Sequence, residues 1–168
     1  WSIGYYVYST VDLTGRHSVL MNSSKTHSFD LKMASDRKSG YHVGTGSGDV
    51  LTFEHAFEKG VWYHVMWTQS KAEGLTMYVN GVKNQTNPWT KTGTAYAPID
   101  IIGGTGFVGY IDEIKVYNRV LTADEVKVSM MNSGLNLTES AKTLNIGETY
   151  LIEASLITSG SVSELTYV

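Results

Sequence analysis

The chain has 168 residues, of which 42% are hydrophobic, with 17 glycines, 11 tyrosines and no cysteine. This length and composition predict one globular, strand-rich domain with its own core, and they exclude disulfide bonds and thiolate metal sites. The formal net charge is −3, without a basic run, and no apolar stretch is long enough to span a bilayer. We therefore expect neither nucleic acid binding nor membrane insertion.

Short apolar or alternating segments, separated by turn residues, follow one another along most of the chain. The dipeptide Asn80-Gly81 is preferred in tight hairpin turns, where both residues adopt positive φ. Residues 86–97 form the longest irregular segment, the kind of loop where function tends to lie on a sandwich. The pattern predicts strands near 1–10, 17–24, 28–34, 39–45, 50–57, 60–70, 74–83, 98–103 and 107–118.

The segment from Ile101 to Val126 has the clearest local pattern, a glycine turn followed by a long strand and a short helix. Thr122 and Glu125 have the spacing of a capping box, which opens a helix by satisfying its first N–H groups. This predicts one helix over about 123–132.

Several strand motifs resemble those of laminin-G-like domains, which have a concanavalin A-like fold. Residues 62–67 (WYHVMW) resemble the W-x-H-V strand of that family, and residues 75–81 (LTMYVNG) resemble its L-x-L-Y-V-N-G strand. Residues 1–8 are similar to its aromatic N-terminal strand, so we expect strands that precede it in the family to be missing. Over about 1–133 the resemblance implies an all-β, concanavalin A-like jelly-roll β-sandwich with one short C-terminal helix.

A different pattern begins after Gly134. Residues 143–151 (TLNIGETYL) resemble the opening strands of a bacterial Ig-like (group 2) domain. The 34 residues that follow Gly134 are too few to close an Ig-like sandwich. The sequence therefore predicts a laminin-G-like sandwich over 1–133 and an incomplete Ig-like β segment over 135–168.

Asp112 is the first candidate metal ligand. It shares the alternation of Tyr110, Ile114 and Val116, so we expect its carboxylate on the apolar side of the strand, where it needs a cation or N–H donors. The resemblance to laminin-G-like domains implies a structural Ca²⁺ held by Asp112, with Asp100 on a neighbouring strand as a second ligand. The alternative is that Asp112 accepts backbone N–H bonds and holds no metal.

Carbohydrate is the candidate ligand. Sugars stack their C–H faces on exposed aromatic rings, while amide and acid side chains bind their hydroxyl groups. Trp89 and Tyr96 in the long loop are the predicted platform, with Gln85 and Asn87 beside them and Tyr41 as a flanking residue. An alternative is that Trp89 anchors the loop over the edge of the sandwich.

Catalysis is not expected of this segment. Glucanases on this fold use paired acids, but Asp112 and Glu113 are adjacent and therefore face opposite sides of a strand. Trp62, Trp67 and Tyr78 lie in strand patterns and are predicted to be core residues. His64 is predicted to be structural, and the five histidines show no metal-type spacing: His17, His27, His42, His55 and His64.

These patterns predict a non-catalytic carbohydrate-binding module of an extracellular, multidomain bacterial protein, secreted or attached to the cell surface. A cell-surface glycan or other carbohydrate is its expected partner. Two hypotheses of other classes stay open: a structural spacer or adhesin module that binds protein, and an accessory domain of a secreted glycoside hydrolase. An exposed Trp89 and Tyr96 beside a groove would favour glycan binding over the spacer.

Overall fold

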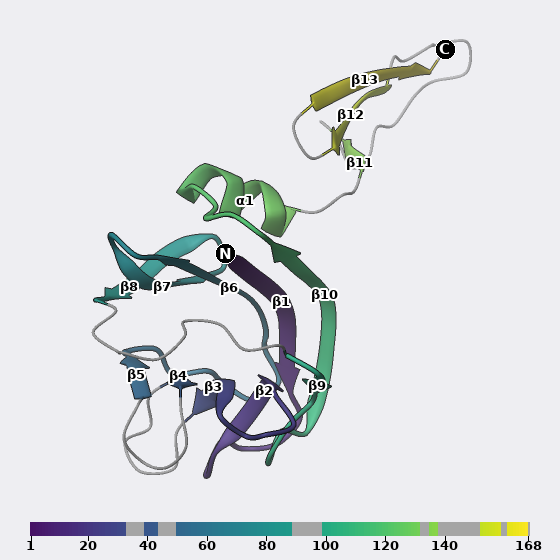
Figure 1. The fold of residues 1–168 in the computed structure, drawn as a ribbon. Coiled ribbons are helices and arrows are strands. Elements are labelled where there is room, and N and C mark those ends of the chain that lie inside the picture. Colours follow the sequence, from purple (N-terminus) through teal and green to yellow (C-terminus); the bar gives the residue numbers. More distant parts are fainter. Residues whose placement is uncertain are drawn as a thin grey trace. The chain divides into compact units, whose positions relative to one another are not determined.

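The computed structural model describes residues 1–32, 39–43, 50–88, 99–131, 135–137, 152–158 and 161–167. The chain divides into two compact units, Trp1–Val126 and Lys127–Val168. Figure 1 shows the described strands of the first unit and the helix, Ala123–Met131, that begins in it. Within the described residues, no helix combines the length and apolarity needed to cross a membrane.

The first unit is a sandwich of two antiparallel sheets with five strands each, which confirms the predicted fold class (Figure 1). Sheet A has the order β10-β1-β6-β7-β8, and sheet B has the order β5-β4-β3-β2-β9. The strands of sheet A are β1 (Ser2–Ser9), β6 (Trp62–Ser70), β7 (Gly74–Val79), β8 (Val82–Asn87) and β10 (Gly109–Tyr117). Those of sheet B are β2 (His17–Met21), β3 (His27–Lys32), β4 (Ser39–Val43), β5 (Val50–Phe53) and β9 (Ile101–Ile102).

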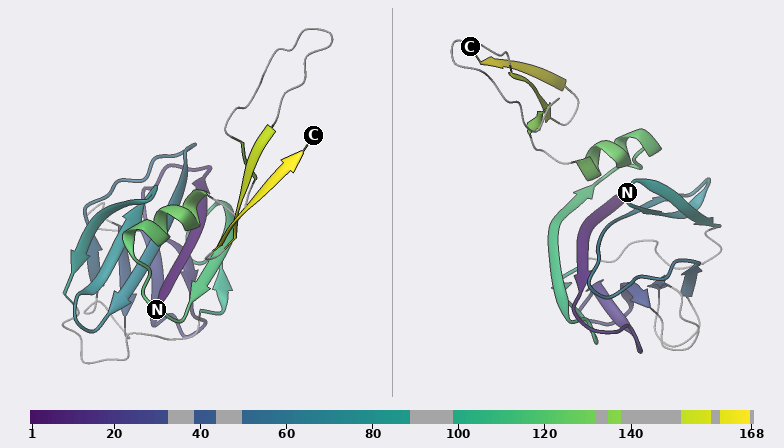
Figure 2. Two further views of the ribbon diagram at one scale, coloured as in Figure 1. Left: turned by 90° about the horizontal axis from the view of Figure 1, so that it is seen from above. Right: turned by 180° about the vertical axis from the view of Figure 1, so that it is seen from behind.

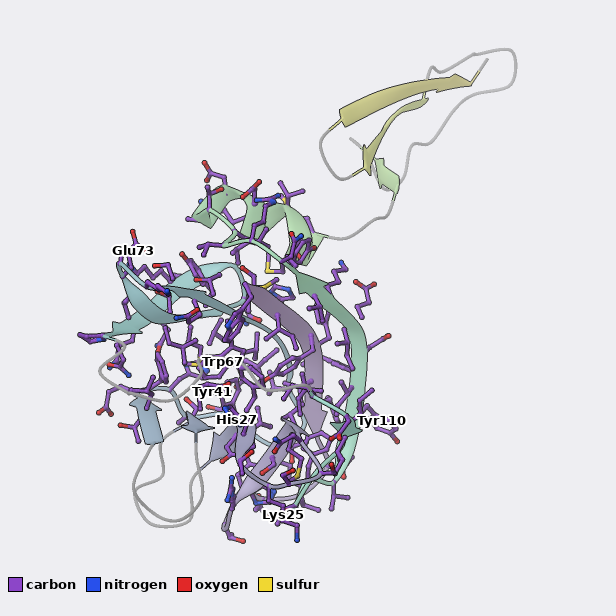
Figure 3. All side chains as sticks on the ribbon, in the orientation of Figure 1. Lys25, His27, Tyr41, Trp67, Glu73 and Tyr110 are labelled. Atoms are coloured by element: carbon purple, nitrogen blue, oxygen red, sulfur yellow. The ribbon has the colours of Figure 1, made fainter. Side chains whose placement is uncertain are left out.

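The core lies between the two sheets, and Trp67 is its largest fully buried side chain. The Trp67 ring packs against Phe29 and Phe53, at centroid distances of 5.4 and 5.0 Å, and its Nε1 donates a 3.1 Å hydrogen bond to the hydroxyl of Tyr5. Figure 3 shows Trp67 in the space between the sheets. The predicted core position of Trp67 is confirmed, whereas that of Trp62 is wrong, because 47% of Trp62 is exposed.

The turn between β7 and β8 follows from its sequence. Asn80 and Gly81 have φ values of 49° and 75°, as expected for a hairpin turn in which both central residues have positive φ. Val79 and Val82 are paired across this turn. The strand predicted over 74–83 therefore ends at the turn, and β8 follows it as a separate strand at the edge of sheet A.

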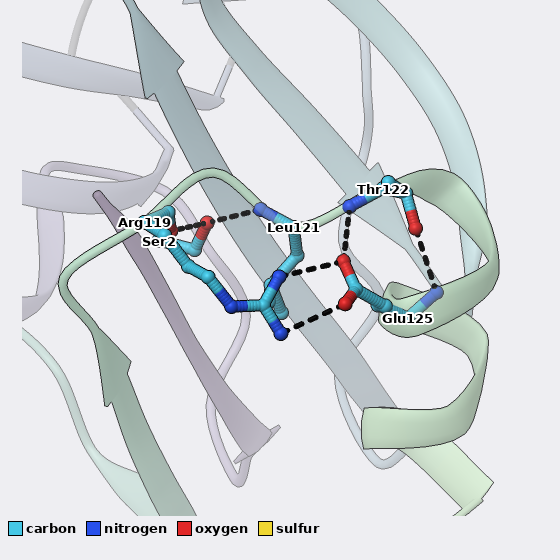
Figure 4. Close-up of polar contacts among 5 residues, drawn as sticks. All are labelled: Ser2, Arg119, Leu121, Thr122 and Glu125. Carbon is cyan, nitrogen blue, oxygen red and sulfur yellow. Dashed lines mark hydrogen bonds and ion pairs between the residues drawn. The ribbon is translucent and has the colours of Figure 1, made fainter. Parts of the chain in front are cut away.

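A capping box starts helix α1 (Ala123–Met131), as predicted. The N–H of Thr122 donates to Glu125 Oε2 at 2.8 Å, and the N–H of Glu125 donates to Thr122 Oγ1 at 3.3 Å (Figure 4). Arg119 makes two 2.8 Å contacts with the same carboxylate. Ser2 joins this turn to β1, since its hydroxyl donates to Arg119 O and accepts from the N–H of Leu121.

The start of α1 covers one end of the outer face of sheet A, the face that points away from sheet B (Figure 2). Leu121 and Val126 are buried there against Met66 and Tyr78, with Tyr117 partly buried beside them. The sequence supplies this second apolar layer through the alternation of β6, which places Met66 outside and Trp67 inside. The rest of the outer face has no helix over it in the described part of the first unit.

A β-bulge in β10 reverses its alternation. Tyr6 is paired with Asp112 and Gly4 with Lys115, so one more residue lies between the two pairs on β10 than on β1. Glu113 sits in this bulge with a φ of 47°, a left-handed conformation that is uncommon for residues other than glycine. As a consequence, side chains before and after the bulge with the same sequence parity lie on opposite faces of the sheet.

The second unit contains a three-stranded antiparallel sheet of β11 (Leu135–Leu137), β12 (Ile152–Thr158) and β13 (Ser161–Tyr167). Leu135 is paired with Leu156, and Ile152 with Tyr167. Residues 143–151, which carry the Ig-like motif, lie outside the described residues. The Ig-like assignment of 135–168 stays a prediction.

Candidate functional site

The predicted loop platform lies outside the described residues, since neither Trp89 nor Tyr96 belongs to them. Its two predicted polar neighbours are described at the end of β8. Gln85 Oε1 accepts from the N–H of Glu54 at 3.1 Å, and its Nε2 donates to Asn87 Oδ1 at 2.8 Å. Asn87 Nδ2 donates to the carbonyl of Thr52 at 2.6 Å. These amides join the edge strands β8 and β5 and thereby close one side of the sandwich.

Tyr41, the predicted flanking residue, is buried in the core with 2% of its surface exposed. Its ring lies 4.6 Å from that of Phe29 and 6.1 Å from that of Trp1. A small pocket lined only by apolar side chains and Ser2 borders these rings. In the described structure, Tyr41 therefore contributes its ring to the packing between the sheets (Figure 3).

One of the two predicted calcium ligands lies next to a strand of sheet B, and the other lies on a strand of sheet A. Asp100 precedes β9, and its carboxylate accepts from the N–H and the hydroxyl of Ser23 at 2.6 and 2.8 Å. Asp112 is exposed on β10, and its Oδ1 accepts the N–H of Glu113 at 2.8 Å. Among the described residues, no group of three or more His, Asp or Glu side chains could hold a metal ion. A calcium site at either carboxylate would need carbonyl ligands or residues beyond the described ranges, so it stays a prediction.

The expectation that Asp112 faces the apolar side of its strand is wrong. Asp112 and Tyr110 precede the bulge and lie on the outer face, opposite Tyr6 and Tyr8. Val116 follows the bulge and is paired with the core residue Ile3. The prediction assumed an unbroken alternation from Tyr110 to Val116, and it therefore assigned residues of two different faces to one face.

The outer face of sheet A carries a cluster of three aromatic rings, Tyr8, Trp62 and Tyr110, which we call the outer aromatic cluster. Tyr8 on β1 is paired with Tyr110 on β10 and with Trp62 on β6, so the cluster spans three neighbouring strands. Its ring centroids are 5.4 Å (Tyr8–Trp62), 5.9 Å (Tyr8–Tyr110) and 6.5 Å (Trp62–Tyr110) apart. Figure 3 shows Tyr110 on the side of β10 that faces away from sheet B.

Two rings of this cluster are open to solvent. Trp62 is 47% exposed and Tyr110 is 61% exposed, and their ring planes differ by 29°. Tyr8, on the strand between them, is half-buried, and its hydroxyl lies near Gly60. Gly109 allows β10 to approach β1 here, because a Cβ at this position would collide with the carbonyl of Tyr8. The strands thus hold two nearly parallel aromatic surfaces in fixed positions.

Polar side chains lie next to the outer aromatic cluster, between it and the part of the face under α1. Tyr6 and His64 are cross-strand partners whose rings lie 5.0 Å apart. Lys115 Nζ and Glu113 Oε2 form an ion pair at 3.0 Å. Asp112, opposite Tyr6, completes this second group and is its exposed carboxylate.

His64 is kept neutral by its surroundings. It is only 2% exposed, and its pKa is lowered to about 4, mainly by this burial and also by the charge of Lys115, whereas the charge of Glu113 acts in the opposite direction. Burial and the charge of Glu113 both raise the pKa of Tyr6, whose hydroxyl therefore stays protonated near neutral pH. This agrees with a structural role for His64 and leaves Tyr6 as a neutral hydroxyl on the same face.

The outer aromatic cluster was not predicted from the sequence. A signal for it exists in β6, where Trp62 shares the alternation of His64 and Met66 while Trp67 belongs to the opposite set. The partners of Trp62, however, come from strands about fifty residues away in the chain on either side, and a single sequence does not give their register.

This arrangement of sheets is that of a concanavalin A-like β-sandwich. Residues 1–127 match the laminin G family Laminin_G_3, described as the concanavalin A-like lectin/glucanases superfamily. The match covers most of the chain, and the chain belongs to this family. A sequence search among curated proteins finds no significant match.

Three solved structures have a similar fold. Domain 4 of the extracellular arabinanase AbnA from Geobacillus stearothermophilus, solved with arabinotriose, is 18% identical with a TM-score of 0.58 over 77% of this chain. A Bacteroides ovatus protein of proposed carbohydrate-binding function is 16% identical with a TM-score of 0.56 over 98% of this chain. A Trypanosoma rangeli sialidase with sialic acid is 18% identical with a TM-score of 0.51 over 77% of this chain. The chain spans 65%, 53% and 22% of these three structures, respectively. At such identities the likeness concerns the fold.

Proposed function

We propose that the first unit is a non-catalytic carbohydrate-binding module whose ligand stacks on the outer aromatic cluster. The observation that supports this is the pair of exposed, nearly parallel rings of Trp62 on β6 and Tyr110 on β10, the two strands that flank β1. Aromatic faces bind the C–H face of a sugar, and rings that are already fixed by strands lose little entropy on binding. The Tyr6 hydroxyl and the Asp112 carboxylate lie beside the rings, where they could bind sugar hydroxyl groups.

The cellular context belongs to the same proposal. We place the module in an extracellular, multidomain bacterial protein, secreted or attached to the cell surface. Support comes from the arabinanase, which is extracellular and carries a domain of this fold. The accessory role in a glycoside hydrolase is the second candidate, because both this arabinanase and the sialidase combine the fold with other parts of an enzyme.

Substitution of the exposed rings tests the function. Trp62→Ala and Tyr110→Ala should each weaken binding to neutral polysaccharides by about 1–2 kcal/mol, roughly tenfold, in calorimetric titrations. Because both rings are largely exposed, the melting temperature should change by only a few degrees. Ile102→Ala is the matched control, since Ile102 is 64% exposed on sheet B and should not affect binding.

Trp89→Ala separates the two proposed platforms. Binding that survives Trp62→Ala and Tyr110→Ala but is lost in Trp89→Ala would move the site to the 84–100 loop predicted from the sequence. If the unmodified protein binds no member of a broad glycan array, the carbohydrate proposal is wrong. The spacer or adhesin hypothesis would then be favoured.

A further inference from the structure

We propose that the outer face of sheet A selects neutral glycan chains over acidic ones, because an exposed carboxylate that forms no ion pair with any described residue lies beside the outer aromatic cluster. This inference rests on the proposed function and specifies the class of carbohydrate that the face would take. It assigns to Asp112 a role in specificity, distinct from the calcium role expected from the family resemblance.

The strand register places a row of polar residues beside the row of aromatic residues that forms the outer aromatic cluster. Each of three strands places an aromatic residue and a polar residue two positions apart on the outer face, about 7 Å from each other along the strand. The aromatic row is the outer aromatic cluster, and the polar row is Asp112, Tyr6 and His64, again joined as cross-strand partners. A sugar stacked on the first row therefore has its hydroxyl edge within reach of the second.

Among the described residues, the charges around the cluster leave Asp112 without an ion-pair partner. The carboxylate of Glu113 is paired with Lys115 at 3.0 Å, and that of Asp12 with Lys59 at 3.6 Å on the side of the cluster near Gly60. In the described ranges, by contrast, the Asp112 carboxylate has one hydrogen bond, from the N–H of Glu113, and no ion pair. The residue is exposed, and both oxygens of its carboxylate only accept hydrogen bonds when ionised.

An ionised carboxylate distinguishes ligands by charge. It accepts charge-assisted hydrogen bonds from the hydroxyl groups of a neutral sugar, but it repels a uronate or another acidic sugar. For two exposed charges about 4 Å apart in water, this repulsion corresponds to about a fivefold difference in affinity, and salt reduces it. The outer face should thus bind neutral chains more tightly than acidic chains of the same backbone.

Matched polysaccharide pairs test this preference. The probes are galactan with polygalacturonan, a glucan with its C6-oxidised form, and xylan without and with glucuronate substituents, titrated at low salt in the presence of EDTA. The unmodified full chain should favour the neutral member of a pair about fivefold. Asp112→Asn, which keeps size and shape, should bring this ratio close to one. Glu73→Gln removes the same charge at the β6–β7 turn, away from Tyr110 in Figure 3, and should leave the ratio unchanged.

The outcomes separate this inference from the function on which it rests. The selection by charge is wrong if binding depends on Trp62 while the neutral and acidic members of a pair bind equally. It is also wrong if Asp112→Asn and Glu73→Gln change the neutral-to-acidic ratio equally. In either case the carbohydrate site remains supported. If Trp62→Ala does not weaken binding, or nothing binds, the proposed function fails and the selection fails with it. A preference that disappears only in Asp112→Asn supports the inference.

Discussion

At the scale of single residues, the outer face of sheet A places exposed and buried side chains only two positions apart on one strand. Trp62 is nearly half exposed, whereas His64, two positions later on the same strand, is only 2% exposed. His64 packs against the Tyr6 ring, and its backbone N–H donates to Asn80 Oδ1 at 2.9 Å. A buried neutral histidine makes the stability of the sandwich depend on pH.

Protonation of His64 should destabilise the fold in acid. Its pKa falls from 6.5 to about 4 on folding, so the folded state binds its proton less readily than the unfolded state. The contribution of neutral His64 to the free energy of unfolding is therefore fully present above pH 6.5, and it is lost as the pH falls towards 4. Melting temperatures of His64→Gln between these pH values should fall less steeply than those of the unmodified protein. Parallel curves would show that His64 does not contribute to acid lability.

Calcium binding through Asp112 is the second prediction at this scale. If Asp112 is a ligand, millimolar calcium should raise the melting temperature, chelator should reverse the effect, and Asp112→Asn should abolish it. If calcium does not change the melting temperature of the unmodified protein, the calcium prediction is wrong. The roles of Asp112 would then be its hydrogen bond from Glu113 and its proposed contact with sugar.

At the scale of elements, helix α1 depends on the turn that precedes it. The capping box of Thr122 and Glu125 satisfies its first donors, and Arg119 binds the same carboxylate. The hydrogen bond from Arg119 is the main cause that lowers the pKa of Glu125 to about 2, and the backbone bond from Thr122 adds to it. Because the buried Leu121 and Val126 flank this turn, the cap also positions the apolar layer over Met66.

Loss of the cap should therefore reduce stability. Thr122→Ala is expected to lower the free energy of unfolding by about 1 kcal/mol, as measured by denaturant titration, because a helix N–H loses its acceptor. Thr122→Ser keeps the hydroxyl and should retain most of the stability. Equal losses in both variants would assign the effect to packing of the threonine methyl group.

At the scale of the whole molecule, the sequence change after Gly134 predicts a boundary between an independent sandwich and an appendage. The two compact units meet at Val126 and Lys127, within the element α1. The first unit contains both five-stranded sheets and the core, so it has what a stable domain requires.

Limited proteolysis tests this boundary. Cleavage is expected first near 132–135, leaving a fragment that keeps the melting temperature and the glycan binding of the full chain. A shortened chain of residues 1–131 should behave in the same way. Initial cleavage inside 1–130, or loss of folding in the shortened chain, would place the domain limit elsewhere.

The features that the sequence determined by itself are local. The hairpin turn at Asn80-Gly81 and the capping box at Thr122 and Glu125 each depend on residues within a few positions, and both have the predicted geometry. The sandwich class was likewise predictable, because alternating apolar segments must bury one face and the strand motifs resemble those of one family. The hydrogen bonds of Gln85 and Asn87 were not predictable from the sequence, since they connect β8 of sheet A with the β5 region of sheet B.

The tertiary structure alone decided the candidate site. Tyr8, Trp62 and Tyr110 meet because β1 lies between β6 and β10, a sheet order that no local pattern encodes. The bulge at Glu113 places Asp112 on the outer face, although its alternation with Val116 predicted the apolar side. Register and bulges depend on packing between strands distant in the chain, so the exposed aromatic surface and its carboxylate follow only from the folded sheet.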